Sequence, residues 1–334
     1  MVGRTMALFL KAIAHSLPDL HLKNSDFPGL DVLSSRMFQG TRERYQVGRN
    51  DSVVELFARA AEKLSPEARA ELASVDTLLT NVSVPDLPFT GCGAMVAERL
   101  GIRPNTVLDL HNGGCISFIL MMDLARALMQ THGAKKILIC SGQTAAGRIF
   151  PFEQMKNKPQ AALYGDAVSL AIFSDEGILQ LENVIWRCHP EFSADMTLDF
   201  EDGRKYWEPG TALATLEYKD KKTKSVILRG NRMVPEAMKL VLEKQGIDAH
   251  SLSALVTNQP NTLFLEAWRN SLELPEEKHF HTFAEFANLF QAGIPINLER
   301  AIESGKLQPG SWVMLSGFSH AADYSAAALM RVPQ

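Results

Sequence analysis

The chain contains 334 residues, of which 46% are hydrophobic and 22% are charged, and its formal net charge is −4. This composition is typical of a globular protein with two domains or one two-lobed unit, and it excludes collagen-like, disordered and disulfide-scaffold proteins. The slight acidic excess provides no basic field for phosphates, so we expect no nucleic acid partner.

Several features of the sequence bear on the cellular compartment and on metal binding. The N-terminal apolar run from Met6 to Ile13 is interrupted by Lys11 and is not followed by a signal-peptide cleavage site. No stretch approaches 18 uninterrupted apolar residues, so we expect no membrane span. The cysteines form no CxxC pair, and no His, Cys or Asp cluster has metal-ligand spacing. We therefore expect a cytoplasmic protein with free thiols and no metal site.

Helical periodicity and short apolar runs alternate along the chain. Helices are predicted at 52–63, 115–130, 234–244 and 295–303. Strands are predicted at 77–82, 106–110, 136–141, 167–173, 254–257 and 312–316. Residues 179–229 mix aromatic and charged side chains and predict a solvated hairpin or loop. This alternation predicts an α/β protein with a mostly parallel, buried sheet.

The second half of the chain repeats elements of the first. Segment 74–81 is similar to 251–258, and segment 133–142 is similar to 305–317. Asn81 lies 60 positions before Ser141, and Asn258 lies 58 positions before Ser316. Similar elements at nearly equal spacing predict a duplicated unit. We place the two halves at 1–175 and 176–334.

The sharpest local signal lies at 106–130. An apolar strand runs into His111-Asn112-Gly113-Gly114, and Cys115 then opens a helix. Backbone N–H groups at the first turn of a helix favour a thiolate and can hold a developing oxyanion. Cys115 is therefore a candidate nucleophile for thioester chemistry, although a buried structural thiol would show the same pattern. Cys92 is a weaker candidate, and Cys140 and Cys188 are interpreted as structural.

Several segments together resemble ketoacyl synthase III-type proteins of the thiolase superfamily. They are Gly40-Thr41-Arg42-Glu43-Arg44, Asn112-Gly113-Gly114-Cys115, Tyr164-Gly165-Asp166-Ala167, Asn258-Gln259-Pro260-Asn261, Ala287-Asn288 and Leu315-Ser316-Gly317-Phe318. The resemblance spans essentially the whole chain. It implies a duplicated thiolase-like five-layer αβαβα fold, a homodimer, and Cys115 as the residue that accepts the acyl group.

The sequence departs from this family at the second catalytic position. The family's motif is His-Gln-Ala-Asn, and here Asn258 replaces the histidine. The family's third catalytic residue, an asparagine, is retained as Asn288. Two amides can still donate hydrogen bonds to an enolate, but an amide cannot take a proton as imidazole can. We therefore do not expect ordinary fatty-acid initiation.

His320 is a candidate replacement for the missing histidine. In the family this part of the chain forms a loop close to the nucleophile, and Asp323 could orient the imidazole. A surface-loop histidine fits the same pattern, and His111 is a weaker rival. His279 and His281, on one face of a strand-like segment, are interpreted as structural.

Positions that recognise the acyl donor have also changed. The tryptophan and arginine that sandwich the adenine of coenzyme A in the family correspond to Ser34 and Phe38. An arginine that helps to dock acyl carrier protein corresponds to Leu263. The resemblance therefore implies a phosphopantetheine thioester, on coenzyme A or acyl carrier protein, as substrate rather than as a bound cofactor.

Three positions are retained around the expected acyl tunnel. Arg148 and Asn231 lie near positions that line the pantetheine entrance in the family. Phe89 matches a residue that reaches across the dimer and closes the partner's acyl pocket.

These features predict an acyltransferase of specialised, polyketide-like or fatty-acid-like metabolism. It would form an acyl-enzyme on Cys115 and pass the acyl group to a small-molecule acceptor, with Asn258, Asn288 and His320 in the site. One alternative is a decarboxylative or non-decarboxylative condensing ketosynthase that uses Asn258 and Asn288. Another is a non-catalytic partner subunit of a heteromeric ketosynthase complex.

Overall fold

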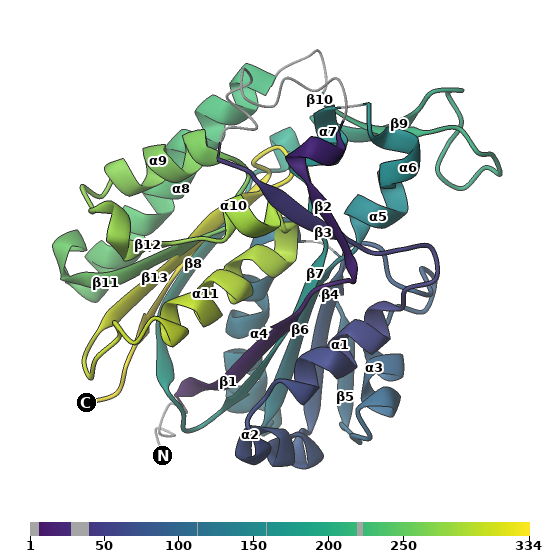
Figure 1. Cartoon of the computed structure of the whole chain (residues 1–334). Helices are drawn as coiled ribbons and strands as arrows, with labels where there is room; N and C mark the ends of the chain where they lie inside the picture. Colours follow the sequence, from purple (N-terminus) through teal and green to yellow (C-terminus); the bar gives the residue numbers. More distant parts are fainter. Residues whose placement is uncertain (1–6, 28–39, 112, 158, 219–222) are drawn as a thin grey trace.

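The computed structural model describes residues 7–27, 40–111, 113–157, 159–218 and 223–334, and one mixed sheet runs through it (Figure 1). Its ten strands follow the order β12-β11-β13-β14-β8-β1-β7-β6-β4-β5. The first five in the chain are β1 (Leu8–Ser16), β4 (Thr77–Val82), β5 (Thr106–Asp109), β6 (Ile137–Gln143) and β7 (Ala167–Ser174). The other five are β8 (Leu179–Cys188), β11 (Leu252–Thr257), β12 (His279–Phe280), β13 (Trp312–Ser319) and β14 (Tyr324–Arg331).

The two halves of this sheet have the same topology. In the first half β4 pairs in parallel with β5 and β6, and β7 joins β6 to β1 in antiparallel fashion. In the second half β11 pairs in parallel with β12 and β13, and β14 joins β13 to β8 in antiparallel fashion. An antiparallel contact between β1 and β8 links the halves. The predicted division at residues 175 and 176 falls in the turn between β7 and β8, and it stays a prediction.

Helices cover both faces of each half-sheet. They are α1 (Val53–Glu62), α2 (Pro66–Glu71), α3 (Gly93–Arg99), α4 (Ser117–His132), α5 (Ala145–Ile149), α6 (Phe152–Met155), α7 (Pro159–Leu163), α8 (Thr223–Gln245), α9 (Thr262–Asn270), α10 (Phe283–Phe286) and α11 (Gly293–Glu303). The largest hydrophobic cluster places α4 and α11 between the two half-sheets. A second cluster packs α1 and α3 on the outer face of the first half, and a third packs α8 and α9 on the outer face of the second. These contacts build five layers, α-β-α-β-α.

The predicted helix at 52–63 shows how the sequence fixes an element. Its apolar residues recur at helical spacing, so Val53, Leu56, Phe57 and Ala60 all face the sheet and are buried. Ser52 caps its first turn by accepting the Glu55 N–H. The helix therefore begins after Ser52, because the Ser52 hydroxyl accepts a hydrogen bond from a first-turn N–H that has no partner within the helix.

The structure corrects three expectations. The N-terminal apolar run belongs to β1, a strand in the middle of the sheet. Residues 179–229 are not simply a loop, because β8 pairs with both β14 and β1. Helix α8 begins at Thr223 instead of 234 and contains Pro235. By length and composition alone, the helix Gly114–His132 could cross a membrane, and in this structure it packs as α4 in the core.

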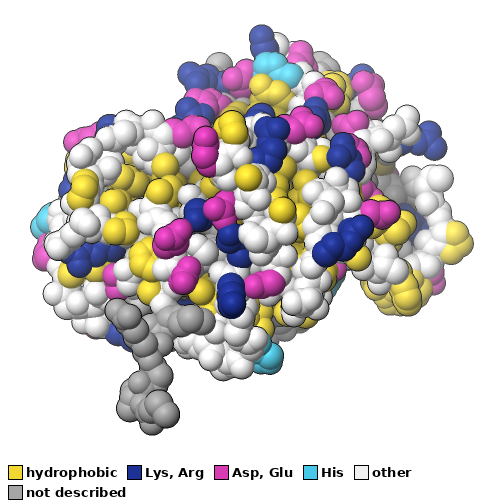
Figure 2. Space-filling model, turned by 90° about the horizontal axis from the view of Figure 1, so that it is seen from below, with side chains coloured by type: hydrophobic (Ala, Val, Ile, Leu, Met, Phe, Trp, Pro, Cys, Tyr) yellow, Lys and Arg dark blue, Asp and Glu magenta, His cyan; other side chains and the backbone are white. Residues whose placement is uncertain are grey.

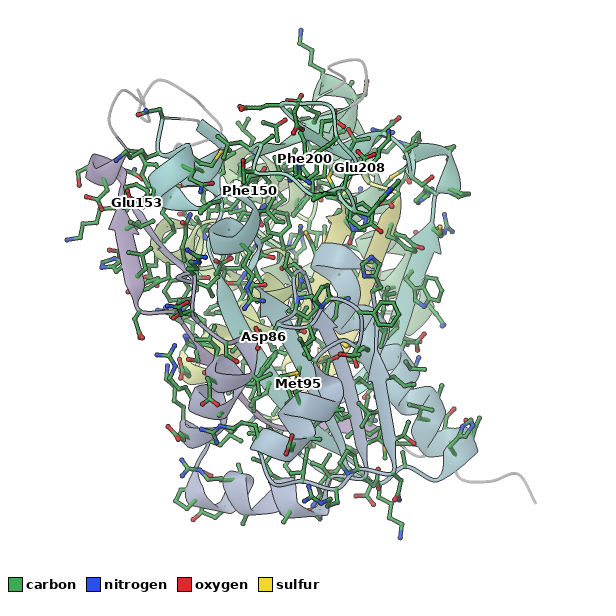
Figure 3. All side chains as sticks on the ribbon, turned by 90° about the vertical axis from the view of Figure 1, so that its right-hand side faces the viewer. Asp86, Met95, Phe150, Glu153, Phe200 and Glu208 are labelled. Carbon is green, nitrogen blue, oxygen red and sulfur yellow. The ribbon has the colours of Figure 1, made fainter. Side chains whose placement is uncertain are left out.

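Two short hairpins complete the fold. One joins β2 (Leu20–Lys23) to β3 (Glu43–Gln46), and the other joins β9 (Met196–Phe200) to β10 (Ala214–Tyr218). In Figure 3, Phe200 and Glu208 of the second hairpin lie near one end of the molecule, well away from Asp86 and Met95. On the face shown in Figure 2, acidic and basic side chains are interspersed.

Candidate active site

Cys115 lies in the 3-10 turn η3 (Gly114–Ile116), which leads directly into α4. Gly113 and Gly114 both have positive φ values, +92° and +44°, which favour glycine. A Cβ at Gly114 would lie 2.8 Å from Nε2 of His320, so that position also has no room for a side chain. The double glycine thus lets the nucleophile turn approach the loop after β13.

Burial dominates the acidity of Cys115. The residue is 7% exposed, and loss of hydration raises the pKa of its thiol to about 12. Hydrogen bonds from the Asn258 side chain and from its own backbone N–H act in the opposite direction, and Asp323 adds to the increase. The backbone N–H at the helix start favours the thiolate in the expected direction, but burial has the larger effect on the pKa. A base must remove the proton for Cys115 to attack.

Asn258 follows β11 and lies beside the sulfur of Cys115. Its Oδ1 accepts the N–H of Phe318 at 3.4 Å, and its Nδ2 donates to the carbonyl of Phe318 at 3.2 Å. Gly317 makes this pairing possible, because a Cβ there would lie 2.2 Å from Oδ1. The side chain at the predicted histidine position is thus held by two backbone hydrogen bonds.

His320 and Asp323 form a pair at the end of β13. Nδ1 of His320 lies 3.0 Å and 3.2 Å from the two carboxylate oxygens of Asp323. This contact places the proton on Nδ1, and Nε2 faces Gly114, next to the nucleophile. The His320 side chain is 34% exposed, whereas that of Asp323 is 10% exposed. The imidazole is therefore partly open to solvent while its Nε2 faces the residue before Cys115.

Ser319 is a site residue that the sequence reasoning did not single out by its side chain. Its Oγ accepts the N–H of Ile116 at 3.2 Å and donates to the carbonyl of Gly113. The hydroxyl therefore clamps the turn on both sides of Cys115. No local pattern reveals this role, because Ser319 lies more than 200 positions further along the chain.

Asn288 lies at a strained corner beside the site. It follows Ala287, whose φ is +58°, and its Oδ1 accepts the N–H of Phe290 at 3.1 Å. The next turn, η8 (Phe290–Ala292), packs against η3. Gln259 donates to the carbonyl of Ala287 and thereby holds the corner in place. Asn288 is thus near the nucleophile turn, as predicted.

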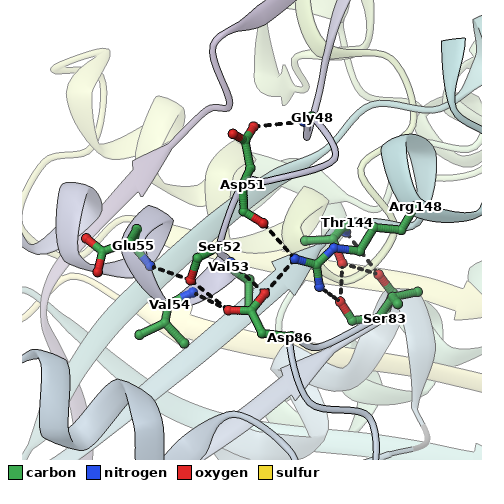
Figure 4. Close-up of polar contacts among 11 residues, drawn as sticks. Gly48, Asp51, Ser52, Val53, Val54, Glu55, Ser83, Asp86, Thr144 and Arg148 are labelled. Atoms are coloured by element: carbon green, nitrogen blue, oxygen red, sulfur yellow. Dashed lines mark hydrogen bonds and ion pairs between the residues drawn. The ribbon is translucent and has the colours of Figure 1, made fainter. Parts of the chain in front are cut away.

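Arg148 is held by contacts inside the first half (Figure 4). Its guanidinium donates to the carbonyls of Val84 and Asp51 and pairs with the carboxylate of Asp86. Asp86 in turn accepts hydrogen bonds from Ser52 and Val53 at the start of α1. These contacts describe a structural clamp, and the role of Arg148 at the pantetheine entrance stays a prediction.

The side-chain oxygen of Asn231 is buried, whereas Phe89 is exposed at the surface. The Oδ1 of Asn231 on α8 is buried, and the described residues offer it no hydrogen-bond partner. The adjacent Gly230 packs against Phe318, which places Asn231 close to the site. Phe89 is 98% exposed on the loop between β4 and α3.

The remaining candidates occupy varied positions. Ser34 and Phe38 lie outside the described residues. His111 is exposed, Leu263 is half-buried, and Cys92 and Cys140 are buried in the first half. The described residues contain no group of three or more His, Cys, Asp or Glu side chains that could hold a metal ion.

The buried pair His279 and His281 is separate from the site. His279 contacts Thr257 at 3.0 Å, and burial lowers its pKa to about 3. His281 lies beside it, and burial also lowers the pKa of this histidine.

Known proteins resemble this chain in sequence. Residues 242–331 match the family model described as 3-oxoacyl-[acyl-carrier-protein (ACP)] synthase III C terminal. The chain is 26% identical to a beta-ketoacyl-[acyl-carrier-protein] synthase III of Geobacillus kaustophilus over 95% of this chain and 96% of that protein. It is 25% identical to the enzyme of that name from Xanthomonas campestris, over 94% and 95% of the two chains.

Solved structures agree with the fold. The beta-ketoacyl-[acyl carrier protein] synthase III of Thermus thermophilus superposes with a TM-score of 0.81 at 22% identity, covering 96% of this chain and 98% of that one. A variant of Xanthomonas campestris OleA gives a TM-score of 0.78 at 18% identity, covering 98% of both chains. The predicted thiolase-like α/β fold is confirmed. In sequence the chain is similar to ketoacyl synthase III proteins over almost its whole length, with Asn258 at the position where the histidine of that family is expected from the sequence.

Proposed function

We propose that this protein is an acyl-thioester transferase that forms an acyl-enzyme on Cys115 and passes the acyl group to a small-molecule acceptor. The observation that carries the proposal is the placement of Cys115. Its turn lies at the start of a buried helix, the Asn258 amide lies at its sulfur, and the His320 imidazole faces the adjacent glycine. The proximity of a thiol, an amide donor and an imidazole supports their proposed roles as nucleophile, hydrogen-bond donor and base.

In the first half-reaction, His320 takes the thiol proton of Cys115, and the sulfur attacks the donor thioester. The tetrahedral oxyanion is held by the N–H groups of Cys115 and of the Ser319–His320 loop. The pantetheine thiol then leaves with the proton from His320. Because burial keeps the Cys115 thiol protonated, the imidazole is needed in this step.

The donor is a pantetheine thioester of coenzyme A or of an acyl carrier protein. Among the described residues the buried Oδ1 of Asn231 has no hydrogen-bond partner, which supports this assignment because a pantetheine amide N–H would satisfy it. With Leu263 in place of the family's arginine, contact with a carrier protein must use other residues. We place the reaction in the cytoplasm, where Cys115 stays a reduced thiol.

We also propose that the protein is a homodimer. Phe89 is almost fully exposed, and the neighbouring edge strand β5 leaves Leu108 39% exposed. A large apolar side chain beside an open strand edge fits an interface between two copies. Sedimentation velocity should show a dimer that Phe89→Ser weakens, and a monomeric wild type would contradict this part of the proposal.

Intact-protein mass spectrometry tests the acyl-enzyme. We expect incubation with acetyl-CoA, hexanoyl-CoA or the matching N-acetylcysteamine thioesters to add the mass of the acyl group. The adduct should disappear in Cys115→Ala and persist in Cys188→Ala, because Cys188 is exposed on the second half. An unmodified wild type, or an adduct that survives Cys115→Ala, would refute the proposal and favour the non-catalytic subunit.

A further inference from the structure

We infer that the acceptor is an alcohol or an amine, and that His320 is the base that deprotonates it. This inference rests on the proposed acyl-enzyme at Cys115 and adds the chemical class of the second substrate. Two independent features of the site carry it. Asn258 has few hydrogen bonds left to donate, and a carboxylate-oriented imidazole stands at the exposed side of the nucleophile.

The first feature concerns Asn258. Its carbonyl oxygen accepts from Phe318, one of its amide hydrogens donates to Phe318, and the other lies at the sulfur of Cys115. Decarboxylative condensation needs donors for the oxygen of the enolate that forms as carbon dioxide leaves. Asn258 could offer an enolate only the hydrogen that already serves Cys115. Asn258 therefore contributes little to an enolate, and condensation would depend on the amide of Asn288.

The second feature concerns His320. Asp323 holds Nδ1, so the neutral imidazole presents a lone pair on Nε2 toward Gly114. A lone pair accepts protons and does not stabilise an enolate. A carbon nucleophile made by decarboxylation needs no proton removed, whereas a hydroxyl or an ammonium-derived amine becomes a good nucleophile when a base takes its proton. The arrangement therefore matches a protic acceptor.

The transfer step balances with these groups alone. Nε2 of His320 takes the O–H or N–H proton while the acceptor heteroatom attacks the carbonyl carbon on Cys115. The new C–O or C–N bond forms, the C–S bond breaks, and the sulfur leaves as a thiolate. The imidazolium returns the proton to that sulfur. The products are an ester or amide and the free thiol, with no oxidant, reductant or cofactor.

The test separates the two half-reactions. Wild type and His320→Ala are loaded with hexanoyl-CoA, the variant by prolonged incubation at raised pH because it lacks the acylation base, until intact mass shows equal occupancy. Both are then freed of donor and chased with 1-hexanol, ethanolamine, malonyl-CoA or hydroxylamine. We expect wild type to form hexanoyl ester or amide, and His320→Ala to do so about 100-fold more slowly or worse. Hydroxylamine, which attacks thioesters without a base, should discharge both at similar rates. Added imidazole should partly restore His320→Ala.

Matched variants keep the outcome interpretable. Asp323→Asn should slow the same transfer, and His189→Ala should not, because only the backbone N–H of His189 contacts Asp323. If His320→Ala does not fold, His320→Gln gives the same comparison. Discharge by malonyl-CoA with release of carbon dioxide, but not by the alcohol or amine, would overturn the inference and leave the acyl-enzyme standing. Unaltered transfer in His320→Ala would overturn it as well. Absence of any acyl adduct would instead refute the proposed function.

Discussion

Two helix starts occupy equivalent places in the two halves, and one of them carries Cys115, the proposed nucleophile. The η3 turn before α4 packs against the end of β13, and the η8 turn before α11 packs against the end of β6. At the first, Ser319 clamps the turn that presents Cys115. At the second, the amide of Gln291 donates to the carbonyl of Gly142 at 2.8 Å. One frame thus holds the proposed nucleophile on one side and a buried polar contact on the other.

The largest difference between the two halves is expected when the glycines at the ends of β6 and β13 are replaced by alanine. In Gly317→Ala the new Cβ would meet Asn258 Oδ1 at 2.2 Å, whereas in Gly142→Ala it would meet Val82 at 3.1 Å. We expect Gly317→Ala to slow acylation of Cys115 at least about 100-fold and to cost about 3 kcal/mol of stability. Gly142→Ala should cost about 1 kcal/mol and acylate normally. Timed intact-mass measurements and urea unfolding test this, and equal effects would refute the contrast.

A smaller contrast is expected between Asn81, which lies in β4, and Asn258, which follows β11. Asn258→Ala leaves both the N–H and the carbonyl of Phe318 without their partner, whereas Asn81→Ala removes a bond to the carbonyl of Leu110. We expect unfolding free energy to fall by about 3 kcal/mol for Asn258→Ala and about 1 kcal/mol for Asn81→Ala. Urea titration measures both values. A smaller loss for Asn258→Ala would show that the Phe318 pairing contributes little.

The serines on β13 give a third comparison. Ser319→Ala removes both bonds that clamp the nucleophile turn, and Ser316→Ala removes one bond to the carbonyl of Ala326. Each variant should lose about 1–2 kcal/mol. Only Ser319→Ala should slow acylation, by about tenfold, with KM for the donor unchanged. If Ser316→Ala slows acylation equally, the clamp is structural and has no positioning role.

The smallest expected effect is on the pH dependence of the unfolding free energy, which differs between cysteines of the two halves. Burial raises the pKa values of Cys92 and Cys115 to about 12, and raises that of Cys140 well above 9. The unfolded thiols ionise near pH 9 and the folded ones do not, so stability is complete below pH 9 and declines from pH 9 toward 12. Each thiol should cost about 1 kcal/mol by pH 10. Cys140→Ala should flatten the decline in unfolding free energy, whereas Cys188→Ala should leave it unchanged.

Periodic elements could be predicted from the sequence, and elements defined by distant partners could not. Helix α1 and strand β4 match their predicted ranges because apolar spacing and a Ser52 cap specify them locally. Strand β1 was missed because Lys11 interrupts its apolar run, although β7 and β8 on either side give it partners. The sequence predicts that α8 starts at 234, next to Pro235, whereas the helix starts at Thr223. The helix packs on β13 and β14, which are distant in the sequence.

The same distinction applies to the site. Two glycines before a helix pointed to Cys115, and three-residue spacing pointed to the pair of His320 and Asp323. The pairing of Asn258 with Phe318 depends on the parallel register of β11 and β13, which brings together residues 60 positions apart. The raised thiol pKa could not be predicted either, because it depends on how deeply the turn is buried.

The pairing of Asn258 with the backbone of Phe318 also constrains how this sequence can evolve. A carboxamide presents one acceptor and one donor side by side, and an imidazole ring cannot serve the same N–H and carbonyl together. A return to histidine at this position would leave at least one buried backbone group unsatisfied until β13 also changed. The asparagine is therefore not a single reversible replacement. The strand end, Gly317 and Asn258 form a unit that must change together.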